Sequence, residues 1–290
     1  MNTPRFVPFT GLALTLLLIT GSELGGQPAA GKPRFYNTVK QKLLEGKQVV
    51  GGTVVTADPE VYCAVAAAGF DFTWIEMQHS PLTYQEVARM IFACKGAAAI
   101  PFIRVPDATE GDIQKATDIG ALGIILPMVD TVEKAQNAVK FAKYPPVGRR
   151  SQGNGQYGAV WGSSYRETAN DNMMIVALIE NPAGAKIVKE IASVPGVDVV
   201  FVASTDLSSF SGLKQGDPAY EAIVTSVVDT TVKVGLAVGG PLAWRGRPRF
   251  AFFQGPTEAA LIRCGAHVSL GVKPAGCPTT GVAATEGKER

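Results

Sequence analysis

Two short apolar runs with a helical segment between them constrain the fold of this chain most strongly. The runs are Met174–Ile179 and Val197–Ala203, and neither shows the alternation of a half-exposed strand. Continuous aliphatic runs of this length predict strands that are buried on both faces. Between them, Asn181–Ser193 carries apolar side chains at helical spacing, so the stretch predicts a βαβ unit of a parallel sheet.

A carboxylate follows each of these two strands. Glu180 comes directly after the first, and Asp206 comes just past the second. Ligands of parallel α/β folds bind at the carboxyl ends of the strands, and two acids at one rim suit a hard divalent cation. The structural alternative for Asp206 and Ser208 is a helix N-cap.

The remaining chain repeats the strand–helix pattern between residues 32 and 271. Strands are expected at Gln48–Val55, Phe72–Met77, Ala98–Val105, Gly123–Val129, Gly235–Gly239 and His267–Gly271, besides the two runs above. Eight strands alternating with helices predict an α/β fold, a (β/α)8 barrel. No GxGxxG motif follows the first strand, which weakens the doubly wound alternative.

Two segments near the carboxyl terminus do not follow the pattern. Pro241–Phe253 is expected to extend the loop after the seventh strand, and residues 272–290 are expected to be a disordered tail. The eighth helix of the barrel is therefore expected to be degenerate or missing. His267, at the start of the expected eighth strand, is interpreted as structural.

The N-terminal residues 1–31 resemble a secretory signal peptide, or a retained N-terminal anchor. Arg5 precedes the apolar run Phe9–Ile19, and small residues follow. We expect an exported protein if this signal works and a cytoplasmic one otherwise, with no membrane contact beyond this segment. The net charge of +2 and the absence of a dense Lys/Arg run argue against nucleic acid as a partner.

The four cysteines show no metal-ligand spacing. Cys63 and Cys94 fall in expected helices, where a buried free thiol is the usual state. An exported location would allow one disulfide, but the sequence does not indicate its pairing.

Ionisable side chains also end the second and third strands. His79 follows the second strand and could act as a general base, or be a loop histidine held for structure. Glu76 could orient His79 or pair with an arginine. Arg104 ends the third strand, where it could bind an anionic substrate or form a salt bridge with Glu76 or Glu180.

Two further segments could contribute to the site. Ser204 and Thr205, just before Asp206, could offer backbone N–H groups and hydroxyls to an anion. The loop Tyr144–Gly158, with Arg149 and Arg150 among glycines, could be a lid over the mouth or a solvated connection.

An ordered set of motifs resembles the HpcH/HpaI aldolase/citrate lyase family of pyruvate/phosphoenolpyruvate-binding barrels. In chain order the motifs are D-F-x-x-I-E-M-x-H-S-P (Asp71–Pro81), P-x-I-R-V-P (Pro101–Pro106), D-I-G-A (Asp118–Ala121), I-L-P-M-V (Ile125–Val129), Y-P-P-x-G-R-R (Tyr144–Arg150), I-E-x-P (Ile179–Pro182) and T-D-L-S (Thr205–Ser208). Aldolases of this family cleave 4-hydroxy-2-oxo acids to pyruvate, or a close relative, and an aldehyde, with a divalent metal.

The resemblance implies a ligand set and catalytic roles. Glu180 and Asp206 would hold Mg²⁺, Mn²⁺ or Co²⁺, and backbone groups at Thr205 and Asp206, with Ser204 beside them, would contact the carboxylate of a small 2-oxo acid. Arg104 would stabilise the enolate oxygen and His79 would accept the proton.

One acid completes the implied catalytic set. Asp118 matches the family acid that raises the basicity of the histidine. The resemblance also implies a homo-oligomer in which a C-terminal helix is buried against a partner subunit. The tail of this chain shows no pattern for such a helix.

Alternative functions follow from departures from the family pattern. Leu178 stands where the family commonly has a substrate-contacting Gln, and Ala203-Ser204 replaces a Gly-Pro. These departures motivate an exported barrel that binds oxo acids without turnover. A citrate-lyase-like or malyl-CoA-lyase-like enzyme is the other alternative. No Lys falls at an expected strand end facing the mouth, which argues against a Schiff-base aldolase.

Overall fold

The structure is a computed structural model that describes residues 35–272 and Cys277. The described residues lie within one compact unit, Arg34–Arg290. The predicted leader, residues 1–31, lies outside them, as does the predicted tail apart from Val272 and Cys277.

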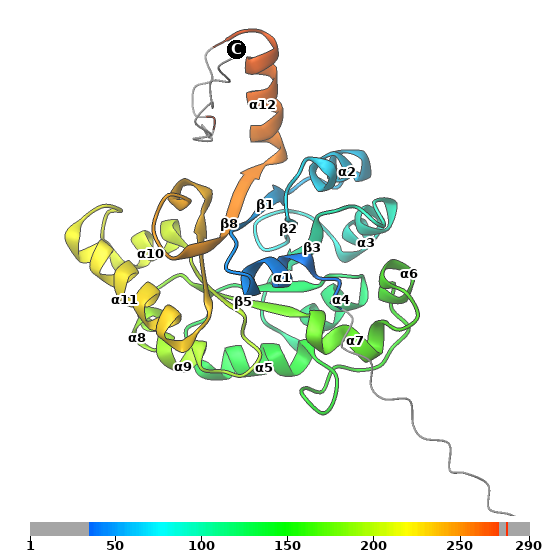
Figure 1. Ribbon diagram of the computed structural model, residues 1–290, viewed down its shortest axis with the longest axis horizontal. Coiled ribbons are helices and arrows are strands. Elements are labelled where there is room, and N and C mark those ends of the chain that lie inside the picture. Colours follow the sequence, from blue (N-terminus) through cyan, green and yellow to red (C-terminus); the bar gives the residue numbers. More distant parts are fainter. Residues whose placement is uncertain (1–34, 273–276, 278–290) are drawn as a thin grey trace, which may run out of the picture. The chain divides into compact units, whose positions relative to one another are not determined.

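Eight parallel strands of the described chain close into a barrel in sequence order, with β8 beside β1 (Figure 1). They are β1 (Val49–Val54), β2 (Phe72–Glu76), β3 (Ile100–Arg104), β4 (Gly123–Leu126), β5 (Met174–Ile179), β6 (Val199–Val202), β7 (Ala237–Pro241) and β8 (Phe250–Thr257). The predicted (β/α)8 barrel is confirmed.

Helices connect most of the strands. They are α1 (Thr38–Leu44), α2 (Pro59–Ala67), α3 (Tyr84–Ala93), α4 (Glu110–Asp118), α5 (Val132–Ala142), α6 (Tyr157–Trp161), α7 (Tyr165–Asn172), α8 (Pro182–Lys186), α9 (Val188–Ala192), α10 (Ser204–Ser211), α11 (Pro218–Val234) and α12 (Glu258–Ser269), with the 3-10 turn η1 (Leu242–Trp244). Side-chain caps begin several of them. Thr83 and Glu86 form a reciprocal capping box at α3, and Asp58 caps α2.

The amino-terminal end of the barrel is closed by α1. Val39 packs with the residues of the barrel interior. The side-chain amide of Asn37 donates to the carbonyl oxygens of Leu122 and Asn172 at 3.3 and 2.7 Å. The carboxyl ends of the strands are therefore the face at which a ligand can be bound, as is usual for this architecture.

Aromatic side chains fill the barrel interior. The ring centroids of Phe72 and Phe252 lie 4.5 Å apart, and those of Trp74 and Phe201 lie 5.3 Å apart. The ring of Phe102 lies against Gly123, where an added Cβ would overlap three ring atoms. Because glycine has no side chain, Gly123 on β4 leaves room for the ring of Phe102.

A methyl group at Gly123 should therefore destabilise the barrel. Phe102 is fully buried and cannot move aside without disturbing other rings. We expect Gly123→Ala to lower the free energy of unfolding by about 1–3 kcal/mol, measured by urea denaturation. Gly111→Ala is the control, because no heavy atom lies within 4 Å of its Cβ and alanine favours helix α4 by about 1 kcal/mol. Equal stability of Gly123→Ala and wild type would contradict this packing argument.

The eighth strand differs from the prediction. The sequence pattern placed it at His267–Gly271, but β8 is Phe250–Thr257, which pairs with β7 and β1. Prolines and arginines around β8 obscured its pattern, and the register shifts against both neighbours show an irregular strand. Only η1 separates β7 from β8, so the segment expected as a loop contains the first half of a barrel strand.

An eighth helix is present, contrary to the prediction that it is degenerate or missing. Helix α12 follows β8 and contains His267, which the sequence had placed on a strand. Glu258 is its one buried residue, and its carboxylate accepts the N–H groups of Val55 and Thr56 at 2.8 and 2.7 Å. Figure 1 shows α12 extending from the end of β8, and apolar side chains such as Ile262 are exposed along it.

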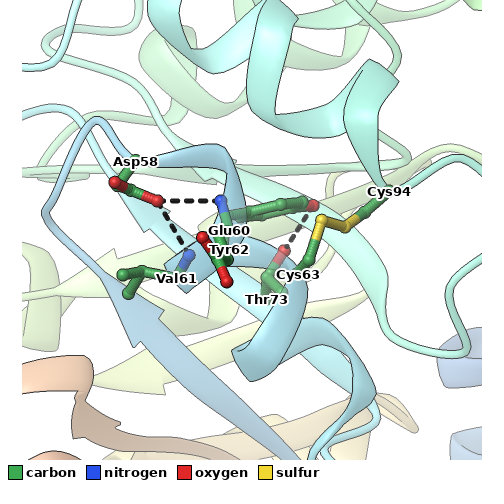
Figure 2. Close-up of a disulfide and its surroundings, with 7 residues drawn as sticks. All are labelled: Asp58, Glu60, Val61, Tyr62, Cys63, Thr73 and Cys94. Atoms are coloured by element: carbon green, nitrogen blue, oxygen red, sulfur yellow. Dashed lines mark hydrogen bonds between the residues drawn. A yellow bond between two sulfur atoms is a disulfide. The ribbon is translucent and has the colours of Figure 1, made fainter.

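Both cysteine pairs form disulfides in the structure, which corrects the expectation of free thiols. Cys63 of α2 is joined to Cys94, the residue that ends α3, with a Cα–Cα distance of 5.4 Å (Figure 2). Cys264 of α12 is joined to Cys277 at 5.7 Å. The helical pattern predicted the positions of Cys63 and Cys94 but not that α2 packs beside α3.

None of the helices in the described part of the chain has the length and apolar character needed to cross a membrane.

Candidate active site

Strand alternation brings three charged side chains to the carboxyl-end mouth of the barrel. Successive side chains of a strand point to opposite faces, so residues two apart share a face. Glu76 lies two residues after Trp74, Arg104 two after Phe102, and Glu180 two after Leu178, and the three apolar residues belong to the interior cluster. Glu76, Arg104 and Glu180 thus cover the inner core, and all three are buried.

Arg104 joins the two acids. Its Nη1 donates to Glu76 Oε2 at 3.2 Å, and its Nη2 donates to Glu180 Oε1 at 2.7 Å. The sequence left open whether Glu76 or Glu180 would be the partner, and the structure pairs Arg104 with both. Its Nε–H is buried and has no hydrogen-bond acceptor among the described residues, so part of its donor capacity is unused.

The charged form of Glu180 is disfavoured by its surroundings. Burial raises the pKa of its carboxyl group, and the negative charge of Asp206 raises it further. The guanidinium of Arg104 and the N–H of Met128 act in the opposite direction; that N–H donates to Glu180 Oε2 at 2.5 Å. Met128 adopts a left-handed backbone conformation, with φ of 52°, at the turn after β4. A second cation beside Glu180 and Asp206 would relieve this repulsion.

Asp206 lies in the first turn of α10, directly after β6. Ala203 is the N-cap of this helix and no side chain caps it, so Asp206 is not the N-cap that the sequence allowed. The N–H of Ala203 donates to the carbonyl of Ile179 at 3.1 Å, which ties the end of β6 to the residue before Glu180. Ser204 is buried and Thr205 is exposed on the same turn, at the positive end of the helix dipole.

His79 lies on the turn after β2 and is exposed. Its backbone N–H donates to Glu76 Oε1 at 3.2 Å. This bond ties the His79 turn to the acid that also binds Arg104. The structure thus places His79, Glu76, Arg104, Glu180 and the turn with Asp206 at one end of the barrel.

Glu76 serves as a structural anchor for this mouth. Oε2 accepts the indole N–H of Trp74 at 3.1 Å besides the Arg104 bond, and Oε1 accepts the N–H of Gln78 at 2.9 Å besides that of His79. A carboxylate has about four acceptor sites, so these bonds occupy it fully. Glu76 therefore positions Arg104 and the His79 turn.

Asp118 does not join this group within one chain, contrary to the role assigned from the resemblance. It is the last residue of α4, which runs from the carboxyl end of β3 to the amino end of β4. Its carboxylate accepts from Arg150 Nη2 at 2.8 Å and from the side-chain amide of Gln114 at 2.7 Å. Asp118 therefore lies at the opposite end of the barrel from His79.

The loop Tyr144–Gly158 also lies at the amino end, because it connects α5 to the helices before β5. It is not a lid over the mouth. Arg150 is buried there, with its guanidinium 4.6 Å from the ring centroid of Tyr144, and it bonds Tyr165 Oη at 2.7 Å. Its role in this chain is to hold the loop against α4 and α7.

Two contributors to the mouth were not identified from the sequence. The N–H of Met128 binds Glu180, and the indole of Trp74 binds Glu76. Strand alternation could have indicated Trp74, which lies two residues before Glu76. No sequence pattern distinguishes a backbone N–H such as that of Met128.

Glu180 and Asp206 fit a divalent cation of the magnesium type. They supply hard carboxylate oxygens from two adjacent strand ends, and their charges repel without a cation. The described residues contain no cluster of three or more His, Cys, Asp or Glu side chains suited to a metal. Two carboxylates with the remaining positions left to water and substrate suit a hard divalent cation rather than a closed structural zinc site.

A closed parallel barrel with an arginine, a histidine and paired acids at its carboxyl-end mouth defines a (β/α)8-barrel enzyme for a small anionic substrate. The chain belongs to the HpcH/HpaI aldolase/citrate lyase family, whose model matches residues 54–239. It is a carbon–carbon lyase of the aldolase type.

Similar proteins include two named aldolases. The chain is 30% identical to the 2-dehydro-3,6-dideoxy-6-sulfogluconate aldolase of Pseudomonas putida, over 66% of this chain and 76% of that protein. It is 31% identical to the hydroxypyruvate/pyruvate aldolase of Roseobacter denitrificans, over 71% and 83%. The crystal structure of an HpcH/HpaI family protein from Burkholderia cenocepacia superposes with a TM-score of 0.74 at 26% identity, covering 81% and 98% of the two chains.

Proposed function

We propose that this protein is a metal-dependent class II aldolase that cleaves a 4-hydroxy-2-oxo acid into pyruvate, or a related 2-oxo acid, and an aldehyde. The observation that carries the proposal is the convergence of Glu180 and Asp206 at one rim, with Arg104 bound to Glu180 at 2.7 Å. The named relatives are aldolases, one of them of hydroxypyruvate and pyruvate.

Glu180 and Asp206 would hold Mg²⁺, Mn²⁺ or Co²⁺, which when bound acts as a Lewis acid toward the oxo acid. Cleavage of the C3–C4 bond leaves an electron pair that delocalises onto the carbonyl oxygen of the 2-oxo acid. Arg104, which is buried beside Glu180, would stabilise that developing charge. Because Glu76 and Glu180 fix its guanidinium, little reorganisation is needed during the reaction.

The remaining roles concern binding and proton transfer. The first turn of α10 presents N–H groups at Thr205 and Asp206, with Ser204 beside them, to the carboxylate of the substrate. His79 accepts the proton of the C4 hydroxyl as the aldehyde forms, and C3 of the enolate then takes up a proton to give the 2-oxo acid product.

The test is release of pyruvate from a panel of 4-hydroxy-2-oxo acids by the purified protein, with and without EDTA. We expect release that EDTA abolishes and that added Mg²⁺, Mn²⁺ or Co²⁺ restores. Tight pyruvate binding without turnover under any metal would instead identify an oxo-acid-binding barrel. Turnover only with a CoA thioester would identify the citrate-lyase-like or malyl-CoA-lyase-like alternative.

We also propose a homo-oligomer. Ile262, Val268 and Leu270 are 65%, 71% and 74% exposed on and beside α12, and a partner subunit would cover these apolar side chains. A second copy would also be needed to bring an Asp118 to the mouth. Sedimentation should show a mass above that of one chain, and Ile262→Lys should shift it toward the monomer. A wild-type protein that sediments as a monomer at micromolar concentration would contradict the proposal.

An oxidising compartment is proposed as the place where the domain folds. The leader pattern of residues 1–31 and the pairings Cys63–Cys94 and Cys264–Cys277 support export. We expect the double variant Cys63→Ser/Cys94→Ser to lose about 2–4 kcal/mol of unfolding free energy, because this disulfide closes a loop of 31 residues. Thermal unfolding of the wild type and the variant, with and without reductant, measures this loss of stability. A wild-type unfolding transition that does not change with reductant would contradict the stabilising disulfide.

A further inference from the structure

Trp74 is a buried donor directly beneath the charged residues of the mouth. Its indole Nε1–H donates to Glu76 Oε2 at 3.1 Å, and its ring lies 5.3 Å from that of Phe201 on the opposite side of the barrel. The side chain has no exposed surface. The aromatic core therefore fixes the ring, and the ring fixes where the N–H points.

The indole and Arg104 bind the same oxygen. Glu76 Oε2 accepts both the Trp74 N–H and Arg104 Nη1, while two backbone N–H groups occupy Oε1. Arg104 binds Glu76 through one N–H, so the orientation of the Glu76 carboxylate sets the position of Nη1. Its Nη2 remains directed at Glu180.

Removal of the indole N–H would take away one of the two bonds that Glu76 Oε2 accepts. The carboxylate could then turn about its Cγ–Cδ bond, because the indole is the donor that the aromatic core holds in place. Arg104 Nη1 would follow Oε2, and the guanidinium would lose its alignment with Glu180.

We propose that Trp74 is a positioning residue for the lyase reaction, which fixes the carboxylate of Glu76 and through it aims the guanidinium of Arg104 at Glu180 and the reacting carbonyl oxygen. This inference rests on the proposed function, in which Arg104 stabilises the enolate.

The test compares Trp74→Phe with Trp161→Phe under metal-saturated assay conditions. Both variants remove one indole N–H, but Trp161 donates to the carbonyl of Gly120 at 2.8 Å at the amino end of the barrel. We expect Trp74→Phe to lower kcat about 10- to 100-fold, as for the loss of a hydrogen bond to a charged group, with KM changed less than about threefold. Trp161→Phe should keep the wild-type kcat.

A double-mutant cycle with Glu76→Gln separates positioning from general packing. If Trp74 acts through Glu76, adding Trp74→Phe to Glu76→Gln should lower kcat by less than about twofold further. Effects that multiply would overturn the proposal. Wild-type protein without lyase activity would refute the proposed function, whereas an active wild type with equal kcat in the Trp74→Phe and Trp161→Phe variants would refute only this inference.

Should Trp74→Phe fail to fold, the wild-type protein provides the measurement. Its three tryptophans give three indole N–H resonances, and the variants Trp161→Phe and Trp244→Phe identify that of Trp74 by elimination. Addition of Mg²⁺ and pyruvate should shift the Trp74 resonance and leave that of Trp161 in place. A Trp74 resonance that does not respond would contradict the proposal.

Discussion

Replacement of Glu180 by glutamine should reduce kcat/KM for metal-dependent pyruvate release by roughly 10³-fold or more. The amide keeps the shape and an oxygen for the Met128 N–H, but it removes the charge that Arg104 and a cation share. We therefore expect weaker Mn²⁺ binding as well, measured by electron paramagnetic resonance without any turnover.

The control for this variant is Glu190→Gln. Glu190 is exposed on α9, so the same chemical change there should leave both kcat/KM and Mn²⁺ affinity at the wild-type level. Unaltered Mn²⁺ affinity in Glu180→Gln would show that Glu180 does not hold the metal.

Replacement of His79 by asparagine should lower kcat by about 10²–10⁴-fold, the usual contribution of a general base. Because the proposal assigns His79 a proton and not the metal, Mn²⁺ and pyruvate affinities measured by calorimetry should stay close to wild type. Unchanged affinities would show that the variant has lost the base while its binding site is still intact.

His267 provides a matched comparison, since it is the other histidine of the chain and lies on α12. His267→Asn should retain the kcat of the wild type. If both variants lost activity equally, or if His79→Asn remained fully active, the proton acceptor would have to be another group.

Short-range patterns carried much of the fold prediction. The apolar run Met174–Ile179 became β5 at the predicted bounds, because burial on both faces requires an unbroken apolar stretch. The pattern failed at β8, where Pro256 and the preceding arginines concealed a strand that its pairing with β1 and β7 stabilises. At β8, pairing with β1 and β7, which closes the barrel, outweighs the low local preference of these residues for a strand.

What the sequence determined by itself is which residues stand at the strand ends. A strand end is local, so Glu76, Arg104, Glu180 and Asp206 could be assigned to one rim without coordinates. The family of the chain was also legible in its ordered motifs, and the matched model confirms it.

Only the tertiary structure decided which of these groups bind one another. Arg104 meets Glu76 across 28 residues of sequence and Glu180 across 76, and Met128 meets Glu180 across 52. It also separated Asp118 from His79, because a helix returns the chain to the far end of the barrel before the next strand begins. Such partnerships arise from the closure and register of eight strands, and no local pattern of residues encodes them.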